Sequence, residues 1–578
     1  MSAGVAAGAP ARRRLTRRGG FAIALLAVAW GLVIHQLGWG QTAHYAQVRA
    51  LADGRADIDP WHWETMDKAW VDGHFYSVKA PGLPLLSLPA YLALDAVGAQ
   101  SAAASAADAA RETPRPKWTP RAEPPYPDHG YSRGRALVVE RRVEDETPMV
   151  WALTLLVALL PAVVLLTLVR RVADRMVPGF GIAAAITLGL CTILMTFASE
   201  YFSHVISAAL GFGAFALLVR EREGPARTPV VALAGLLCGL AVSFEYPVGL
   251  VGVVLFFYAL ARDAPRIGRG AAFAGAAFAG ALPVFAFNQW AFGSPFTFAY
   301  GDAVAVQGLT GHAELGLNDD GFFGITVPEP GAALDLLFAS RGLVSLTPVV
   351  LIGVAGLWML RRGERRSEAN VALAVAAVFF VYNAGYWLPF GGGTPGPRFL
   401  MPAVPFVALG FAEAYRRWRA ATLALAIPSA LLMAVAAITY PLIGDNGTWL
   451  WFDMLTTGNI EHTLFTVLGV SDPWIAIAPV LLLALAAALV AARATPAVAL
   501  GPVRPALALL AGWALVSAVG PTLVGDPVTP LDGGTEALIL VGGAAGVSAL
   551  VLLILRRREL SAQREPGSGG SDPALASP

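Results

Sequence analysis

The residues best suited to chemistry crowd into one polar segment, residues 57–82. A carboxylate there can act as a general base or as a ligand for Mg²⁺ or Mn²⁺. A lysine offers a point charge to a phosphate, and an aromatic ring offers a flat face to a sugar or an anchor at the headgroup level. Four acids are therefore catalytic candidates, and three further side chains are substrate-binding candidates: Asp57, Asp59, Glu64 and Asp67, then His74, Tyr76 and Lys79. The alternative for each acid is a solvated loop.

Four more substrate-binding candidates stand at the ends of apolar stretches: His204, Glu245, Arg341 and Arg398. A charged side chain at mid-bilayer costs about 2.5–3.5 kcal/mol on insertion scales, so these groups are expected at a membrane edge or in a wet cavity. Arg398 follows the run FGGGTPGP and is expected in the first turn of a helix over 399–414. An arginine there opposes the helix dipole, which favours an anionic partner such as phosphate. The alternative is an ordinary residue at a helix end.

Composition excludes other kinds of site. The two cysteines, Cys191 and Cys238, lie inside apolar stretches and indicate no disulfide or metal framework. A net charge of +1 gives no reason to expect nucleic acid. No cofactor is certain, and the acids permit a divalent cation, Mg²⁺ or Mn²⁺, without requiring one.

The elements that must position these residues are membrane-spanning helices. The chain has 578 residues, is 56% hydrophobic and 14% charged, and has a mean hydropathy of +0.60. Basic clusters follow every second apolar stretch, which under the positive-inside rule places all of them on the cytoplasmic face, together with both termini. The outer face then receives the long polar segments. The clusters are 12–18, 170–171, 220–227, 262–269, 361–366, 416–419 and 556–558.

These patterns predict an all-α transmembrane bundle of about 13–14 spans, with a long outer loop that carries interfacial helices after the first span. Residues 81–99 are apolar but rich in proline, so they are predicted to lie at the outer surface. The stretch 101–128, rich in Ala, Pro and Arg, is predicted to be a loose insertion. The predicted spans are 20–38, 148–169, 179–198, 203–219, 229–244, 247–261, 271–290, 343–360, 370–388, 399–414, 421–440, 473–492, 503–523 and 535–555.

The chain divides into four regions on this interpretation. Residues 1–19 form a basic cytoplasmic N-terminus, and 20–420 form a catalytic transmembrane region with outer loops at 40–147 and 291–341. Residues 421–558 form C-terminal helices with an outer loop at 441–472, and 559–578 form a disordered cytoplasmic tail.

Three motifs in this order resemble the GT-C superfamily of glycosyltransferases, which use lipid-linked sugar donors and include protein O-mannosyltransferases and aminoarabinose transferases. The motifs are GHFYSVKAPGLPLL (73–86), FEYP (244–247) and GPRFLMPAVP (396–405). They look like the family's Lys-Pro turn, its broken helix pair and its late arginine-and-proline helix start. The resemblance covers roughly residues 20–420.

The resemblance implies a bacterial inner-membrane enzyme with its active site on the extracytoplasmic face. It would move a sugar from a polyprenyl-phosphate carrier to a glycan, lipid or protein acceptor. One stretch departs from the family: where many members carry an Asp-Glu pair just after the first span, this chain has QTAHYA (41–46), with no acid. The catalytic acid must then come from Asp59, Asp67, Asp57 or Glu64.

Two other function classes stay open from the residues. A lipid or sugar transporter or flippase would carry ionisable residues deep in several spans, together with internal repeats. The spans here are nearly free of charge, and no repeat stands out. A non-catalytic protein of envelope assembly is the second alternative, which the missing Asp-Glu pair keeps open.

Overall fold

The protein is a helical bundle with a small mixed layer over one end, as seen in a computed structural model that describes residues 9–111, 133–262, 264–304, 321–442, 449–525 and 535–564. The first half of the chain contains most of the short elements. Its helices and strands are α1 (Ala9–Gly31), β1 (Val33–Ile34), α2 (Trp39–Ala52), β2 (Lys68–Val71), β3 (His74–Ser77), α3 (Gly82–Ala96), α4 (Ala99–Arg111), α5 (Arg133–Thr154), α6 (Leu160–Met176), α7 (Gly181–Cys191), α8 (Leu194–Phe197), α9 (His204–Arg222), α10 (Thr228–Phe244), α11 (Gly249–Leu260) and α12 (Arg266–Phe292).

The second half is helical apart from one short strand. Its elements are α13 (Pro330–Phe338), α14 (Leu343–Leu346), α15 (Val349–Leu360), α16 (Arg366–Ala384), α17 (Val404–Arg417), α18 (Arg419–Ile438), α19 (Trp449–Thr457), β4 (His462–Thr463), α20 (Leu464–Val467), α21 (Pro473–Ala494), α22 (Val503–Leu523) and α23 (Thr535–Arg564). Strands β1 and β4 pair antiparallel and join the end of the first helix to the last third of the chain.

The predicted all-α membrane bundle is confirmed. Among the described residues, eight helices are long and apolar enough to cross a membrane, or ten if each of two sharply bent pairs counts as one span. Four shorter apolar helices coincide with predicted spans 20–38, 179–198, 229–244 and 247–261. The number of full-length spans is thus lower than the 13–14 expected, because several apolar stretches form helices too short to cross alone.

The broken helix pair around Glu245 is a hairpin. A methyl group added at Gly249 would lie nearest Val242, and one at Gly252 nearest Cys238. These two contacts run in opposite directions along the chain, so α10 and α11 are antiparallel. The chain therefore turns back at Glu245, as the arginine pattern predicts.

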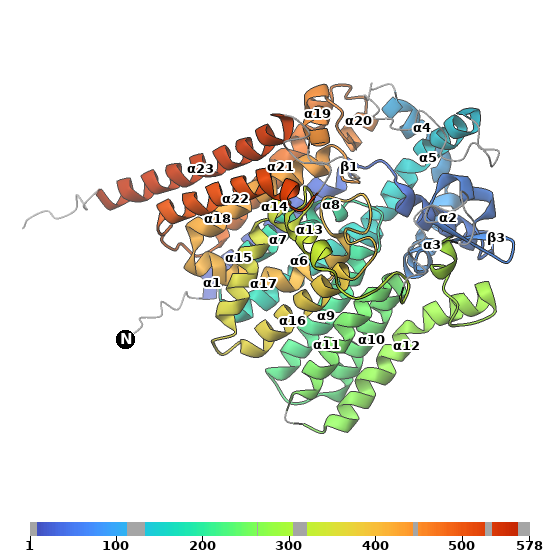
Figure 1. The fold of residues 1–578 in the computed structure, drawn as a ribbon, viewed down its shortest axis with the longest axis horizontal. Coiled ribbons are helices and arrows are strands. Elements are labelled where there is room, and N and C mark those ends of the chain that lie inside the picture. Colours follow the sequence, from blue (N-terminus) through green and yellow to red (C-terminus); the bar gives the residue numbers. More distant parts are fainter. Residues whose placement is uncertain are drawn as a thin grey trace, which may run out of the picture.

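Several basic clusters meet at one end of the bundle. Glu221 pairs with Arg262 and Arg269, and Glu223 pairs with Arg175 and Arg365. Figure 1 shows the start of α1 and the end of α23 on the left of the bundle, with α2, α3 and β3 on the right. We call the end of the bundle where these ion pairs lie the arginine-rich end. Its location on the cytoplasmic face stays a prediction.

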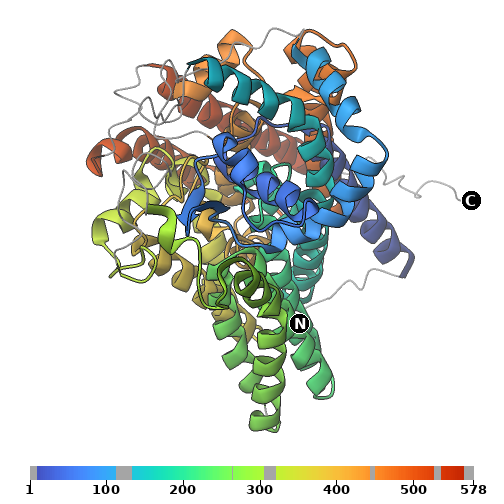
Figure 2. The ribbon, with the colours of Figure 1, turned by 90° about the vertical axis from the view of Figure 1, so that its right-hand side faces the viewer.

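The opposite end is covered by the segment that follows the first helix. Figure 2 shows the layer of α2, α3 and the β2–β3 hairpin, in blue, facing the viewer across the bundle. The prediction of a helix near residues 81–99 is confirmed by α3, which meets α4 at a bend of 87°. The expectation of a loose insertion over 101–128 is wrong for residues 101–111, because the alanines there form α4. Residues 112–132 lie outside the described part of the chain.

Candidate functional site

Helix α2 is an interior helix, although it belongs to the first loop. Every residue from Gly40 to Ala50 is buried. The polar side chains of such a helix need partners, and two pairs supply them: Gln41 donates to Glu200, and Arg49 pairs with Glu64. Three buried side-chain atoms of α2 still have no hydrogen-bond partner among the described residues: Nδ1 of His44, a residue only 1% exposed, Oε1 of Gln47 and Nε of Arg49.

Lys79 lies in the turn between the β2–β3 hairpin and α3. Its Nζ is 2.8 Å from Oδ2 of Asp67, which immediately precedes β2, and both side chains are mostly buried. The turn is held against the bundle by Gly82, because a Cβ there would lie 2.4 Å from the backbone oxygen of Ser243. Only glycine permits this approach. It brings the Lys79 turn to the end of α10, next to Glu245.

The break between α10 and α11 carries a histidine–carboxylate pair. Nδ1 of His204, the first residue of α9, lies 2.9 Å from Oε1 of Glu245. The hydroxyl of Ser203 donates to the same carboxylate oxygen. A carboxylate that accepts from Nδ1 favours the tautomer with the proton on that nitrogen and fixes the ring orientation. The His204 ring also stacks on Phe202, with 5.6 Å between ring centroids.

Arg398 approaches the same region from the second half of the chain. Its guanidinium carbon lies 5.7 Å from the ring centroid of Phe202 and 5.3 Å from that of Phe399. Its Nε is buried without a hydrogen-bond partner, and the guanidinium forms no ion pair with any described residue. Gly391 makes room for it: φ is +77°, and a Cβ there would lie 2.8 Å from the arginine Cγ.

The expected position of Arg398 in the first turn of a helix over 399–414 is wrong. Residues 398–400 form a short 3₁₀ turn, and α17 begins at Val404. Pro402 and Pro405 explain the delay, because a proline beyond the first turn of a helix cannot donate the backbone hydrogen bond and clashes with the carbonyl four residues earlier, whereas Pro405 is tolerated in the first turn of α17. The case for an anion at Arg398 therefore rests on the guanidinium itself and not on a helix dipole.

These groups form one electrostatic unit. The charges of Lys79, Glu245 and Asp67 act on the ring of His44. Arg398, Asp67 and Glu245 act on Tyr300, a half-buried tyrosine of the second loop. We call the set the junction cluster, because it lies where the first loop meets the bundle: His44, Asp67, Lys79, His204, Glu245 and Arg398.

The electrostatics of the junction cluster follow from burial. Burial, reinforced by the charge of Lys79, lowers the pKa of His44 to about 3, so the ring is neutral near pH 7. Burial also raises the pKa of Tyr300, which keeps its hydroxyl protonated. The cluster thus offers two cationic side chains, two carboxylates and neutral donors in a mostly buried region, where charge interactions are stronger than in water.

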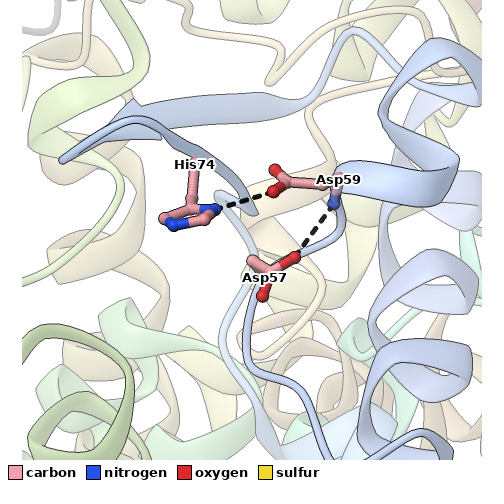
Figure 3. A group of neighbouring side chains, drawn as sticks. All are labelled: Asp57, Asp59 and His74. Carbon is pink, nitrogen blue, oxygen red and sulfur yellow. Dashed lines mark hydrogen bonds and ion pairs between the residues drawn. The ribbon is translucent and has the colours of Figure 1, made fainter.

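Asp57, Asp59 and His74 form a separate group on the hairpin side (Figure 3). One ligand atom from each lies within 4.8 Å of the others, so the group could hold a metal ion. Each oxygen that faces the group already has a protein partner: Asp59 accepts from the backbone N–H of Phe75 and contacts His74 Nδ1 at 2.7 Å. Asp57 accepts from the Asp59 N–H and from Arg55. We call Arg55, Asp57, Asp59 and His74 the hairpin clasp.

The remaining predicted residues lie in structural contacts. Glu64 is buried and paired with Arg49 and Arg142. The hydroxyl of Tyr76 donates to the backbone oxygen of Ala291, which ties the hairpin to the end of α12. Arg341 donates to the backbone oxygen of Gly392 at 2.7 Å and so supports the glycine-rich loop that carries Arg398.

The sequence analysis missed three residues that belong to this region. Phe202 lies between Arg398 and His204, and Tyr300 lies among the charged groups. His44 stands in the stretch 41–46, which attracted notice only for the acid it lacks. In a helix that mixes polar and apolar residues, the sequence does not indicate that a polar residue is buried. The environment of His44 could be identified only from the fold.

Comparisons with known proteins add little to this geometry. No family model matches the sequence, and no curated protein matches it. Among solved structures, the chain is similar to the crystal structure of the Archaeoglobus fulgidus oligosaccharyltransferase in the apo form, at 12% sequence identity and a TM-score of 0.38. The match covers 83% of this chain and 56% of that one. A likeness at this TM-score carries no argument about function.

Proposed function

We propose that the protein is a membrane glycosyltransferase that moves a sugar from a polyprenyl-phosphate carrier to an acceptor on the extracytoplasmic face. The observation that carries this proposal is the half-buried guanidinium of Arg398, whose buried Nε has no hydrogen-bond partner, and which has no anionic partner among the described residues and lies in the same cluster as Lys79. Buried charges are normally paired. Two cations held together in a bundle of membrane helices suit an anion that arrives from the lipid phase.

A carrier phosphate would exchange with an existing ion pair. Lys79 holds Asp67 at 2.8 Å, and a phosphate that bridges Lys79 and Arg398 would compete with that carboxylate. Arginine binds phosphate with a planar fork, and lysine binds it as a point charge. Phosphate binding would then release Asp67, which could accept a proton from the acceptor.

The transfer itself would be a displacement at the anomeric carbon of the sugar. The acceptor oxygen forms a bond to that carbon, and the carbon–oxygen bond to the phosphate breaks. The electron pair leaves on the phosphate oxygen, where Lys79 and Arg398 offset the charge. The hydroxyl proton passes to Asp67. The products are a glycoside of the acceptor and the polyprenyl phosphate.

Asp67 is our candidate base among the four acids that the sequence offers. It lies in the junction cluster, whereas Asp57, Asp59 and Glu64 hold backbone groups or arginines elsewhere. The hairpin clasp could hold Mg²⁺ or Mn²⁺ through Asp57, Asp59 and His74 only if Arg55 and two backbone N–H groups release the carboxylates. No step of the proposed transfer is routed through such an ion.

The direct test uses purified protein in lipid nanodiscs with radiolabelled polyprenyl-phosphate sugars. Wild type should release sugar from the carrier, Lys79→Ala should lose most of this activity, and Lys79→Arg should recover part of it. If wild type binds the carrier but releases no sugar with any acceptor or metal ion, an envelope-assembly role is favoured over catalysis. If the carrier moves between leaflets without chemical change, the protein is a flippase.

A further inference from the structure

His44 is a buried polar side chain that the proposed mechanism does not use. It lies on α2, with its ring 1% exposed and its Nδ1 without a hydrogen-bond partner in the described part of the chain. The neighbouring ring of Tyr201 meets it edge-on, at 6.3 Å between centroids, and offers no acceptor there. A buried nitrogen left without a partner destabilises the fold, so its position calls for a ligand.

Charged and titratable groups face His44 from four other parts of the fold. Lys79 comes from the turn before α3, Asp67 from the segment before β2, His204 from α9 and Glu245 from the break after α10. Burial and Lys79 hold the ring neutral, while Asp67 and Glu245 act in the opposite sense. The protonation equilibrium of His44 depends on the net charge of this small buried region, so an added anion would shift that equilibrium strongly.

This inference rests on the proposed function. We propose that His44 is a third ligand of the donor phosphate, and that its ring binds a proton when the phosphate arrives. The phosphate offsets the charge of Lys79 and stabilises the imidazolium, whose N–H groups can both donate. His204 is a poorer candidate for this proton, because its Nδ1 is already committed to Glu245.

Proton uptake makes donor binding pH-dependent with a definite sign. The complex holds one more proton than the free protein at any pH between the two pKa values of His44. Affinity therefore falls as the pH rises, by up to about tenfold per pH unit in that window. Above the pKa of His44 in the complex, affinity becomes independent of pH.

Isothermal titration calorimetry can measure this uptake directly. The probe is farnesyl methyl phosphate, a phosphodiester like the donor, whose own charge stays fixed near neutral pH. Binding to the full-length protein in nanodiscs is measured at several pH values in two buffers of different ionisation enthalpy. The variants are His44→Gln and His44→Asn, which keep a polar side chain but cannot titrate, with His74→Gln, outside the junction cluster, as the matched control.

Wild type and His74→Gln should take up close to one proton at the acid end of the range. The two His44 variants should bind more weakly, take up none, and change affinity less than about twofold per pH unit. Binding by wild type without proton uptake, or uptake that persists in both His44 variants, would overturn the inference and leave the donor site standing. Failure of wild type to bind the probe would overturn the donor site as well.

Discussion

The hairpin clasp and the junction cluster contain similar residue types in opposite states. In the clasp, the carboxylates of Asp57 and Asp59 are engaged by Arg55, His74 and backbone N–H groups, and the His74 side chain is 53% exposed. In the junction cluster, the Nε of the half-buried Arg398 and the Nδ1 of the buried His44 have no partner among the described residues. The clasp is complete as it stands, whereas the cluster has capacity for a ligand.

This difference teaches how to choose between two polar groups in one protein. Density of acids along the sequence favoured the clasp region, because several carboxylates lie within a few residues of one another. Dense local groups can satisfy each other, and these hold Asp59 against the start of β3. Groups that come from distant parts of the chain and stay unsatisfied point more strongly to function.

The largest expected effect is the loss of the unpaired arginine. Arg398→Ala should lower sugar transfer by about 10²–10³-fold, because a donor to the developing charge is removed. Arg416→Ala is the matched control, since Arg416 pairs with Glu413 at the opposite end of α17, and it should stay within about twofold of wild type. Equal losses in both variants would mean that Arg398 has no special role.

Asp67→Asn separates the proposed base from the proposed phosphate site. Turnover should fall by about 10²–10⁴-fold because the proton acceptor is lost. Donor affinity should hold or improve, because the carboxylate no longer competes for Lys79. Steady-state kinetics together with direct binding would measure both. A variant that turns over normally would exclude Asp67 as the base and return attention to Asp59.

Lys68 should have an intermediate effect, on the stability of the protein. It sharpens the comparison between the clasp and the cluster, because it belongs to the β2–β3 hairpin yet is buried. Its Nζ donates to the backbone oxygen of His62, and burial lowers its pKa to about 7. Between about pH 7 and pH 10 the unfolded chain holds more protons at this residue than the folded chain. The free energy of unfolding should therefore increase as the pH rises across that window. This gain should be lost again as the pH falls to 7.

The apparent unfolding temperature of detergent-solubilised protein would report this slope. Lys68→Met keeps the apolar stem and removes the titrating group. The difference in unfolding temperature between wild type and variant should therefore become smaller as the pH rises. A difference that is constant from pH 7 to pH 10 would show that Lys68 does not titrate in this range.

The smallest expected effect belongs to the clasp. His74→Ala should leave sugar transfer within about twofold of wild type. His74 is exposed, and its partner Asp59 would still accept the hydrogen bond from the backbone N–H of Phe75. Millimolar Mn²⁺ should leave the unfolding temperature of wild type unchanged, since the facing oxygens have partners. A rise with Mn²⁺ that disappears in His74→Ala would instead make the clasp a metal site.

Much of the framework could be predicted from the sequence. Apolar length and arginine spacing predicted the bundle, the helix hairpin at Glu245 and the shared end of the basic clusters. Lys79 and Arg398 were predicted as binding residues because a cation beside proline and glycine, away from the basic clusters, is unusual. These signals are local or periodic, which is why a single sequence carries them.

The rest depended on contacts between distant segments. His44 and Phe202 acquire their surroundings only when α2 is buried against α9 and the hairpin. The start of α17 was misplaced because a helix that began at Phe399 would hold Pro402 and Pro405 beyond its first turn, where proline cannot donate the helical hydrogen bond. Helix α4 was missed because its buried face consists only of alanines, Ala103, Ala107 and Ala110, which stand among other small residues and give no clear apolar stripe in the sequence.

The most direct test of the account is an experimental structure of the protein in nanodiscs with farnesyl methyl phosphate bound. The account predicts the phosphate within hydrogen-bond distance of both Lys79 and Arg398, with the Lys79–Asp67 pair opened. Phosphate bound instead at the hairpin clasp or at the arginine-rich end, with Lys79 still paired to Asp67, would contradict it.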